Sequence, residues 1–249
     1  MTRRFLGATG VGVGVGLAGL AGLAAAHAGP ALAWIDTLRC RLTPGLAGLG
    51  EAGHVALTFD DGPDPASTPQ VLEALDRLGW RATFFLLGSM TDAAPRLAAE
   101  VADAGHETAV HGYYHRGSLR HTPRWVRNDL ERAIASVTGA TGHRPRWYRP
   151  PFGELSGGAL LAARRYHVTP VLWSAWGRDW RADATAASIV ADLRAGVVDG
   201  GTVLLHDSDC ASAPGSWKNT LAALEPLAEL VAAEGLRVGP LAEHFARRV

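Results

Sequence analysis

The feature that most constrains the fold is an alternation of two kinds of segment from residue 54 onward. Short apolar runs, such as the one that places Val55, Leu57 and Phe59 at every second position, are typical of strands. Longer stretches carry apolar residues at helical spacing. We predict strands over residues 55–60, 83–87, 106–110, 147–149, 168–173, 202–206 and 236–238. We predict helices over residues 67–79, 91–105, 122–139, from 156 onward, over 185–197, and in two pieces divided by Pro226. About seven strand–helix units predict a parallel sheet that closes into a barrel.

The composition fits one folded domain without a nucleic-acid partner. Hydrophobic residues make up 47% of the 249 residues, which is enough to bury a sizeable core. The 24 Lys and Arg residues balance the 24 Asp and Glu residues, whereas a general nucleic-acid binder needs a surplus of cations. Because no linker divides residues 51–249 and no repeat is visible there, these residues are predicted to form a single α/β domain.

The first 33 residues have the features of a targeting segment. Arg3 and Arg4 precede residues 5–26, which carry no charge, and small-residue sites follow at 26–28 and 31–33. This pattern predicts a secretory signal peptide, with a loose twin-arginine character, and hence a secreted or cell-envelope protein. An uncleaved membrane anchor is the alternative, because the apolar run approaches the roughly 20 residues that span a bilayer. Contact with a membrane is expected only in that case.

Two cysteines exclude a disulfide framework and a cysteine-built zinc site. Cys40 lies in residues 34–50, a short lead-in between the targeting segment and the domain, and Cys210 lies near the end of the chain. In an oxidising compartment the two could form one disulfide. Two unpaired thiols are an equally acceptable interpretation, because spacing alone gives no geometry.

Several predicted strands end in a reactive residue. Asp60 and Asp61 end the first strand, His111 follows the third, Arg149 ends the fourth and His206 ends the sixth. In barrels of parallel strands, chemistry takes place at the C-terminal ends of the strands. The sequence therefore predicts that these five polar groups meet on one rim.

The rim includes a candidate metal site. His111 and His115 are four residues apart, so on a helical turn both imidazoles would face the same way. Together with an aspartate from another strand end they make a set of two histidines and one carboxylate. Such a set leaves coordination positions for water and substrate, as a catalytic metal requires.

Other rim residues offer binding and proton transfer. Arg149 opens a Pro-Pro turn and could clamp a carboxylate, or it could be an exposed arginine on a structural turn. His206 follows a buried strand and can donate a proton near neutral pH, although a hydrogen-bonded core histidine is the simpler interpretation of that residue alone. Trp173, Trp176 and Trp180 could pack in the core or stack on a sugar ring.

Taken together, the motifs resemble those of the polysaccharide deacetylase family, that is, the NodB homology domain or carbohydrate esterase family 4. Residues 58–63 match its Thr-Phe-Asp-Asp-Gly-Pro motif, residues 111–115 its paired-histidine motif, residues 149–153 its Arg-x-Pro-Phe-Gly motif and residues 204–206 its Leu-x-His motif. The resemblance covers about residues 51–245. It implies a distorted seven-stranded (β/α) barrel and a deacetylase catalytic domain.

The resemblance also implies a role for each matched residue. Asp61, His111 and His115 would bind a divalent metal, most often zinc, and Asp60 would be the general base that takes a proton from the attacking water. Arg149 would orient Asp60.

The remaining roles concern the leaving group and the acetyl group. By resemblance, His206 would protonate the departing amine. A backbone N–H near Phe152 would hold the oxyanion, and Trp180 and Leu204 would line the pocket for the acetyl methyl group.

Two residues depart from the family pattern. Gly112 replaces a hydroxyl residue that could brace the metal-binding histidines. Trp176 replaces an aspartate that in the family tunes the acid histidine, which leaves His206 less protonated at neutral pH unless Asp179 or Asp207 compensates. This departure predicts activity weighted to lower pH, or modest activity.

The leading hypothesis is an exported, metal-dependent hydrolase that removes N-acetyl groups from N-acetylhexosamine polymers or oligomers such as peptidoglycan or chitin. One alternative is an O-acetyl esterase on xylan, or a hydrolase of another small amide, because the same site can attack either carbonyl. Another is a catalytically weak homologue that binds carbohydrate on its tryptophans. Retention of the base, the metal ligands and the acid argues against binding alone. The sequence does not predict an oligomeric state.

Overall fold

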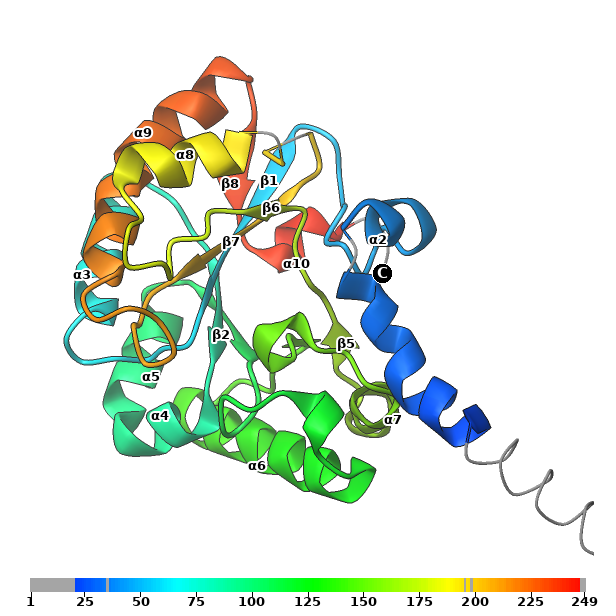
Figure 1. Ribbon diagram of the computed structural model, residues 1–249. Coiled ribbons are helices and arrows are strands. Elements are labelled where there is room, and N and C mark those ends of the chain that lie inside the picture. Colours follow the sequence, from blue (N-terminus) through cyan, green and yellow to red (C-terminus); the bar gives the residue numbers. More distant parts are fainter. Residues whose placement is uncertain (1–20, 35, 195, 198, 247–249) are drawn as a thin grey trace, which may run out of the picture.

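Parallel strands form the centre of the molecule. The computed structural model describes residues 21–34, 36–194, 196–197 and 199–246. Seven strands follow the order β5-β4-β3-β2-β1-β7-β6, and β8 pairs with the first half of β1 beside β2. The strands are β1 (His54–Asp60), β2 (Thr83–Leu86), β3 (Glu107–Val110), β4 (Trp147–Tyr148), β5 (Thr169–Pro170), β6 (Ala175–Trp176), β7 (Thr202–His206) and β8 (Arg237–Gly239). The predicted distorted (β/α) barrel is confirmed, as an open barrel with seven strands on its main path (Figure 1).

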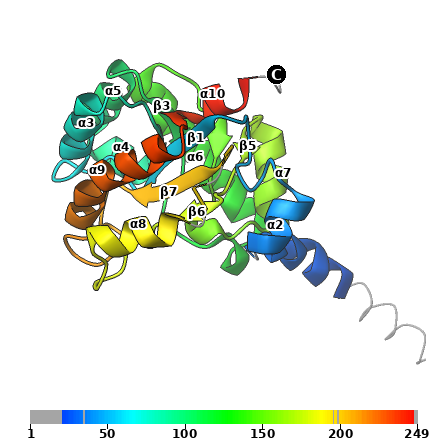
Figure 2. The same cartoon turned by 90° about the horizontal axis from the view of Figure 1, so that it is seen from above.

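Helices surround the sheet, as two views at right angles show (Figures 1 and 2). The α-helices are α2 (Asp36–Leu42), α3 (Thr68–Arg77), α4 (Gly88–Ala93), α5 (Pro95–Asp103), α6 (Pro123–Thr141), α7 (Gly157–Tyr166), α8 (Ala186–Arg194), α9 (Trp217–Ala233) and α10 (Leu241–His244). Short 3-10 helices are η1 (Gly29–Trp34), η2 (Ser118–Arg120) and η3 (Pro151–Gly153), and residues 21–28 are helical. Leu57 and Phe59 of β1 face the helices, in the largest group of buried apolar side chains.

The opposite face of the strands lines the interior of the barrel. Ala56, Phe85 and Ala109 pack there against Leu241 and Phe245 at the end of the chain. These C-terminal residues cover the end of the barrel where β1 begins, because β8, which precedes α10, pairs with the first half of β1. The other end, where the strands finish, is left for the site.

Proline produces two departures from the predicted helices. The helix predicted over 91–105 is divided at Ala94, whose backbone angles (φ −135°, ψ 61°) are not helical, because Pro95 lacks an N–H and disfavours a helical residue before it. The predicted break at Pro226 is wrong, since α9 continues through it. Burial of Leu227 and Leu230 on the same helix offsets the lost hydrogen bond.

The strand predicted over residues 168–173 is much shorter than expected, and β6 was not predicted. After β5, the carbonyls of Val171 and Leu172 accept hydrogen bonds from Arg149 (3.3 and 2.7 Å). The carbonyl of Trp173 accepts one from Arg39 (2.7 Å). Guanidinium groups therefore take the place of a neighbouring strand along this connection between β5 and β6.

The lead-in is attached to the same connection. The amide of Leu172 donates to the carbonyl of Leu46 (2.7 Å), and the hydroxyl of Thr202 donates to the carbonyl of Gly48 (2.6 Å). Leu46 also packs against a small group of buried side chains that includes Leu172. Residues 36–50 thus contact the barrel directly.

The predicted targeting segment falls largely on residues 1–20, which lie outside the described residues. Among the residues that are described, no helix is both long and apolar enough to cross a bilayer.

Candidate active site

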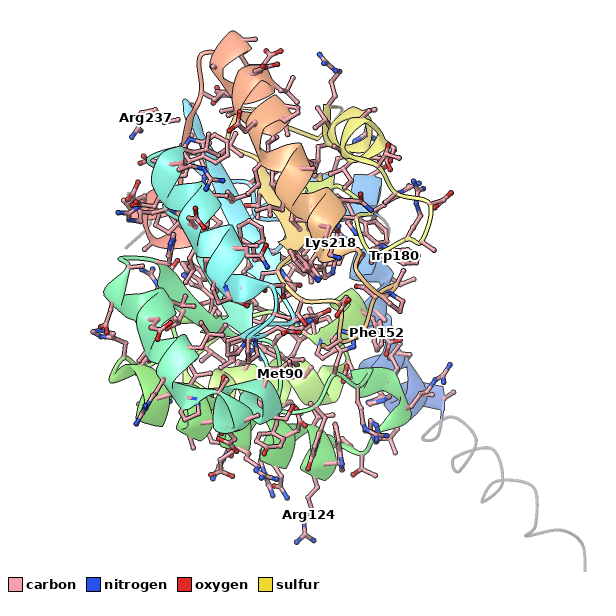
Figure 3. All side chains as sticks on the ribbon, turned by 90° about the vertical axis from the view of Figure 1, so that its left-hand side faces the viewer. Met90, Arg124, Phe152, Trp180, Lys218 and Arg237 are labelled. Carbon is pink, nitrogen blue, oxygen red and sulfur yellow. The ribbon has the colours of Figure 1, made fainter. Side chains whose placement is uncertain are left out.

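The C-terminal ends of the strands surround a cavity of about 360 Å³. Its lining includes Asp60, Asp61, His111 and His206, four of the five polar groups expected on the rim, and also His115. The fifth, Arg149, is fully buried and hydrogen-bonded to Asp60. Its walls include Phe152, Gly153, Trp173, Trp176, Trp180 and Leu204. Figure 3 shows Phe152 and Trp180 on the same side of the molecule. The sequence therefore predicted the position of the site from strand ends alone.

Three of these residues form one cluster of metal-ligand atoms. Oδ1 of Asp61 lies 3.4 Å from Nε2 of His111 and 3.3 Å from Nε2 of His115, and all the ligand atoms lie within 4.8 Å of one another. Nδ1 of His111 lies 2.8 Å from the carbonyl of Arg149, to which it donates. That bond leaves Nε2 of His111 with its lone pair directed at the cluster.

The charges of the cluster fit a cation. Oδ1 of Asp61 is buried and has no hydrogen-bond partner, which is costly for a carboxylate without a compensating positive charge. Burial raises the pKa of Asp61 to about 7. Burial lowers the pKa of His111 and of His115 to about 3, so both imidazoles are neutral and can each offer a lone pair to a metal. Two neutral imidazoles and one carboxylate suit a divalent metal ion.

A tight turn positions Asp61 at the end of β1. Asp61 has a φ of 82°, which L-residues with a side chain rarely adopt and which recurs at functional sites. The carboxylate of Asp207 accepts hydrogen bonds from the amide of Gly62 (3.1 Å) and the hydroxyl of Thr68 (2.6 Å). A Cβ at Gly62 would lie 2.1 Å from Oδ2 of Asp207, so only glycine fits. Asp207 therefore braces the turn, and among the hydrogen bonds of the described residues none joins its carboxylate to the ring of His206.

The paired histidines do not lie on a helical turn, contrary to the prediction. They belong to an irregular loop after β3, in which Gly112 has a φ of 89°. Asp129 of α6 accepts hydrogen bonds from the amides of Tyr113 (2.8 Å) and Tyr114 (3.1 Å). This carboxylate braces the loop that lacks the family's hydroxyl residue. No pattern in the sequence singled out Asp129.

The candidate base is held by a buried arginine. Nη1 of Arg149 donates to Oδ1 of Asp60 (2.7 Å) and to Oγ1 of Thr58 (2.8 Å), and Arg149 is fully buried. The other oxygen of Asp60 faces the metal ligands, 3.7 Å from Nε2 of His111. Burial raises the pKa of Asp60, and the Arg149 guanidinium opposes that rise. The predicted orienting role of Arg149 has a direct geometric basis.

The candidate acid has a carboxylate partner that the sequence could not place. Oδ1 of Asp179 lies 2.7 Å from Nδ1 of His206, and its Oδ2 accepts from the amide of His206 (2.8 Å) and the hydroxyl of Thr220 (2.7 Å). Burial by itself lowers the pKa of His206, but Asp179, followed by Asp61 and Asp60, raises it to about 10. Of the two carboxylates that the sequence offered as compensation for Trp176, it is Asp179 that supplies the negative charge beside His206.

Aromatic side chains form the walls of the cavity. The ring of Trp176 lies 5.7 Å from that of Trp173 and 6.2 Å from that of Trp180. The ring of Phe152 meets that of His115 edge-on at 4.3 Å, and Phe152 is 52% exposed. Trp180 is 40% exposed, whereas Leu204 is buried. The roles assigned to Phe152, Trp180 and Leu204 toward the acetyl group stay predictions.

The two cysteines are not bridged. Cys40 lies on α2, Cys210 lies on the loop after β7, and both thiols are free. Sγ of Cys210 instead lies 3.7 Å from the carbonyl of Asp61. The disulfide that the sequence allowed is therefore absent.

The barrel and its candidate base, acid and metal ligands fit the class of carbohydrate-active hydrolases. A family model described as polysaccharide deacetylase matches residues 48–171. The chain is also 32% identical to a chitooligosaccharide deacetylase of Bradyrhizobium sp. (strain ANU 289) over 198 residues, which cover 75% of this chain and 88% of that protein. The chain belongs to the polysaccharide deacetylase family.

Further similarities extend this result. The chain is 33% identical over 154 residues to the peptidoglycan-N-acetylglucosamine deacetylase PgdA of Listeria monocytogenes, but the match covers 62% of this chain and only 32% of that protein. The chain thus spans about a third of the length of that relative. A solved structure, the family 4 carbohydrate esterase of Streptomyces lividans in complex with acetate, matches with a TM-score of 0.67 and 33% identity, over 75% of this chain and 92% of the other.

Proposed function

We propose that the protein is an exported, metal-dependent N-deacetylase that acts on N-acetylhexosamine polymers or oligomers of the peptidoglycan or chitin type. One observation carries the proposal. A single cavity holds a buried carboxylate fixed by Arg149 and a histidine fixed by Asp179, together with the metal-ligand cluster. Hydrolysis of an amide needs a base, an acid and a polarised carbonyl: Asp60 and His206 offer the first two, and a metal held by the cluster would supply the third.

The first half of the reaction is the attack of water. Asp61, His111 and His115 would hold a divalent cation, zinc by the type of its ligands, which would supply Lewis acidity and lower the pKa of water. Asp60 accepts one proton of the attacking water, whose oxygen forms the new bond to the acetyl carbon. Arg149 keeps Asp60 oriented during this step, because its guanidinium is itself fixed by backbone carbonyls.

The second half is the departure of the amine. His206 donates its proton to the amide nitrogen while the C–N bond breaks, so that acetate and a free amino group are released. A pKa of about 10 keeps His206 protonated at neutral pH, as a general acid must be. The backbone N–H near Phe152 is the proposed oxyanion donor, and Trp180 and Leu204 the proposed walls around the methyl group.

Amide substrates fit better than esters. An ester has a good leaving group and makes little use of a strongly protonated acid, whereas an amine leaves only after protonation. The Asp179–His206 pair therefore favours N-deacetylation over the esterase alternative. The names of two relatives, a chitooligosaccharide deacetylase and a peptidoglycan-N-acetylglucosamine deacetylase, support the same class of substrate.

The cellular location is part of the proposal. Arg3 and Arg4 followed by the uncharged residues 5–26 support export, with the mature enzyme in the cell envelope or outside the cell. Polymers of the cell wall would then be within its reach.

The test is acetate release by purified residues 34–249 from N-acetylglucosamine oligomers, peptidoglycan and acetylated xylan. We expect acetate from the amide substrates, loss of release with a chelator and recovery on addition of zinc. Acetate from xylan alone would replace the proposal with an esterase. No acetate from any substrate by a zinc-loaded protein would overturn the catalytic proposal and favour the binding homologue.

A further inference from the structure

Arg39 is a buried cation that the family motifs do not include. It lies on α2, before the region matched by the family model, which begins at residue 48. Only 2% of its surface is exposed, and its Nη2 donates to the carbonyl of Trp173 at 2.7 Å. Burying a guanidinium is expensive, so its position against the wall of the cavity calls for an explanation.

The segment that Arg39 holds also holds the arginine behind the base. The carbonyls of Val171 and Leu172 accept from Arg149, and the next carbonyl along the chain, that of Trp173, accepts from Arg39. The guanidinium carbons of Arg39 and Arg149 lie 5.5 and 5.8 Å from the centre of the Trp173 ring. Three successive carbonyls thus connect the two arginines.

This segment has little support from the sheet. Residues 171–173 follow the two-residue strand β5 and are not part of a strand. Besides the two arginines, their backbone is fixed by the amides of Val171 and Leu172, which donate to the carbonyls of Tyr148 and Leu46. Leu46 also belongs to the lead-in, so two of these contacts come from residues 36–50. A shift of this segment would move both the Trp173 wall and the carbonyls that orient Arg149.

We propose that Arg39 is a positioning residue for the catalytic site. By holding the carbonyl of Trp173, it fixes the segment that orients Arg149, and through Arg149 it fixes the base Asp60. The lead-in thus contributes a positioning residue to the catalytic domain. This inference rests on the proposed deacetylase function, because orientation of the base matters only for catalysis.

The experiment compares three variants of the full-length protein. Arg39→Met keeps the length of the side chain and removes its donors, Arg39→Lys keeps one cationic donor, and Arg41→Met removes an exposed arginine from the same helix as a matched control. We expect kcat of folded, zinc-loaded Arg39→Met to fall about tenfold or more with a smaller change in KM, since misorientation acts on the transition state. Arg39→Lys should recover part of the loss, and Arg41→Met should match the wild type.

A second readout does not depend on activity. It is the NMR signal of the Trp173 indole N–H in protein with ¹⁵N-labelled tryptophan, which the variant Trp173→Phe identifies. This signal should move or broaden in Arg39→Met and stay in place in Arg41→Met. If Arg39→Met is folded with an unchanged kcat, or if the Trp173 signal does not move, the inference is wrong. If Arg39→Met does not fold, Arg39→Lys decides by the same two criteria. A wild type that releases no acetate would refute the proposed function, while the Trp173 signal would still decide whether Arg39 fixes the segment.

Discussion

The two sides of the catalytic cavity are assembled differently. On the side of β1, β3 and β4, the functional groups come directly from strand ends or the loops after them: Asp60 and Asp61, His111 and Arg149. On the side of β5, β6 and β7, His206 has that origin. Its partner Asp179 comes from the connection between β6 and α8, and the carbonyls that fix Arg149 come from a stretch outside the strands.

With the exception of Arg149, which orients Asp60, the strand ends supply the groups proposed to react, and the connections outside the strands supply the groups that set their charge and orientation. Parallel strands bring reactive side chains to one rim because the register of the sheet fixes where each strand ends. The charge and orientation of those groups depend on partners such as Asp179, which loops deliver. The strand-end side should therefore tolerate almost no change, while changes on the loop side should alter the degree and pH dependence of activity.

The largest effect is expected from Asp60→Asn on the strand-end side. The amide cannot accept the proton of water, so kcat should fall by about a thousandfold, the usual contribution of a general base. Zinc content should stay the same, because Asp60 is not one of the three proposed ligands. Acetate release and metal analysis check both points, with the exposed Asp103→Asn as the control. A variant with wild-type kcat would remove Asp60 from the mechanism.

Loss of a metal ligand should also lower activity, but in this case through weaker zinc binding. His115→Gln should lower zinc affinity and activity together, and excess zinc should restore part of the activity. The exposed His143→Gln should change neither. The melting temperature, measured as a function of zinc concentration, gives the zinc affinity, because a ligand that binds only the folded state raises that temperature. An unchanged zinc response in His115→Gln would contradict the assignment.

On the loop side, Asp179→Asn should move the pH dependence rather than abolish activity. His206 acts in its protonated form, so with a pKa of about 10 the activity of the wild type should be retained across neutral pH and fall only near pH 10. Without the Asp179 carboxylate, the largest influence that raises the pKa of His206 is lost, so that pKa falls and the alkaline limb should move to lower pH. The pH profile of kcat/KM measures this shift. An alkaline limb that stays in place would show that Asp179 does not control His206.

The same contrast explains how much the sequence could predict. The strand over 202–206 was predicted as observed, and four of the five predicted rim residues, Asp60, Asp61, His111 and His206, line the cavity, because alternation and strand ends are local properties. Asp179 could be suspected but not placed, since the path of the chain between β6 and α8 depends on packing across the whole barrel. The β5 region was predicted too long because its apolar run is typical of a strand, whereas its carbonyls bond to Arg149 and Arg39. Hydrogen bonds to residues so distant in the sequence do not show in the pattern of apolar and polar residues.

The smallest expected effect concerns Gly112, where the sequence departs from the family. Gly112→Ser restores a hydroxyl residue, but the φ of 89° and a Cβ only 3.0 Å from Oδ2 of Asp129 make the exchange unfavourable here. Strain of this kind costs about 1–3 kcal/mol, so the variant should lose stability and gain no activity. Gly142→Ser is a matched control, because its φ of 72° imposes similar strain with no atom near the new Cβ. Denaturant unfolding of both variants separates backbone strain from the contact with Asp129. If Gly112→Ser weakens zinc binding and Gly142→Ser does not, the Asp129 brace supports the metal ligands, and equal zinc affinity in the two variants would limit its role to stability.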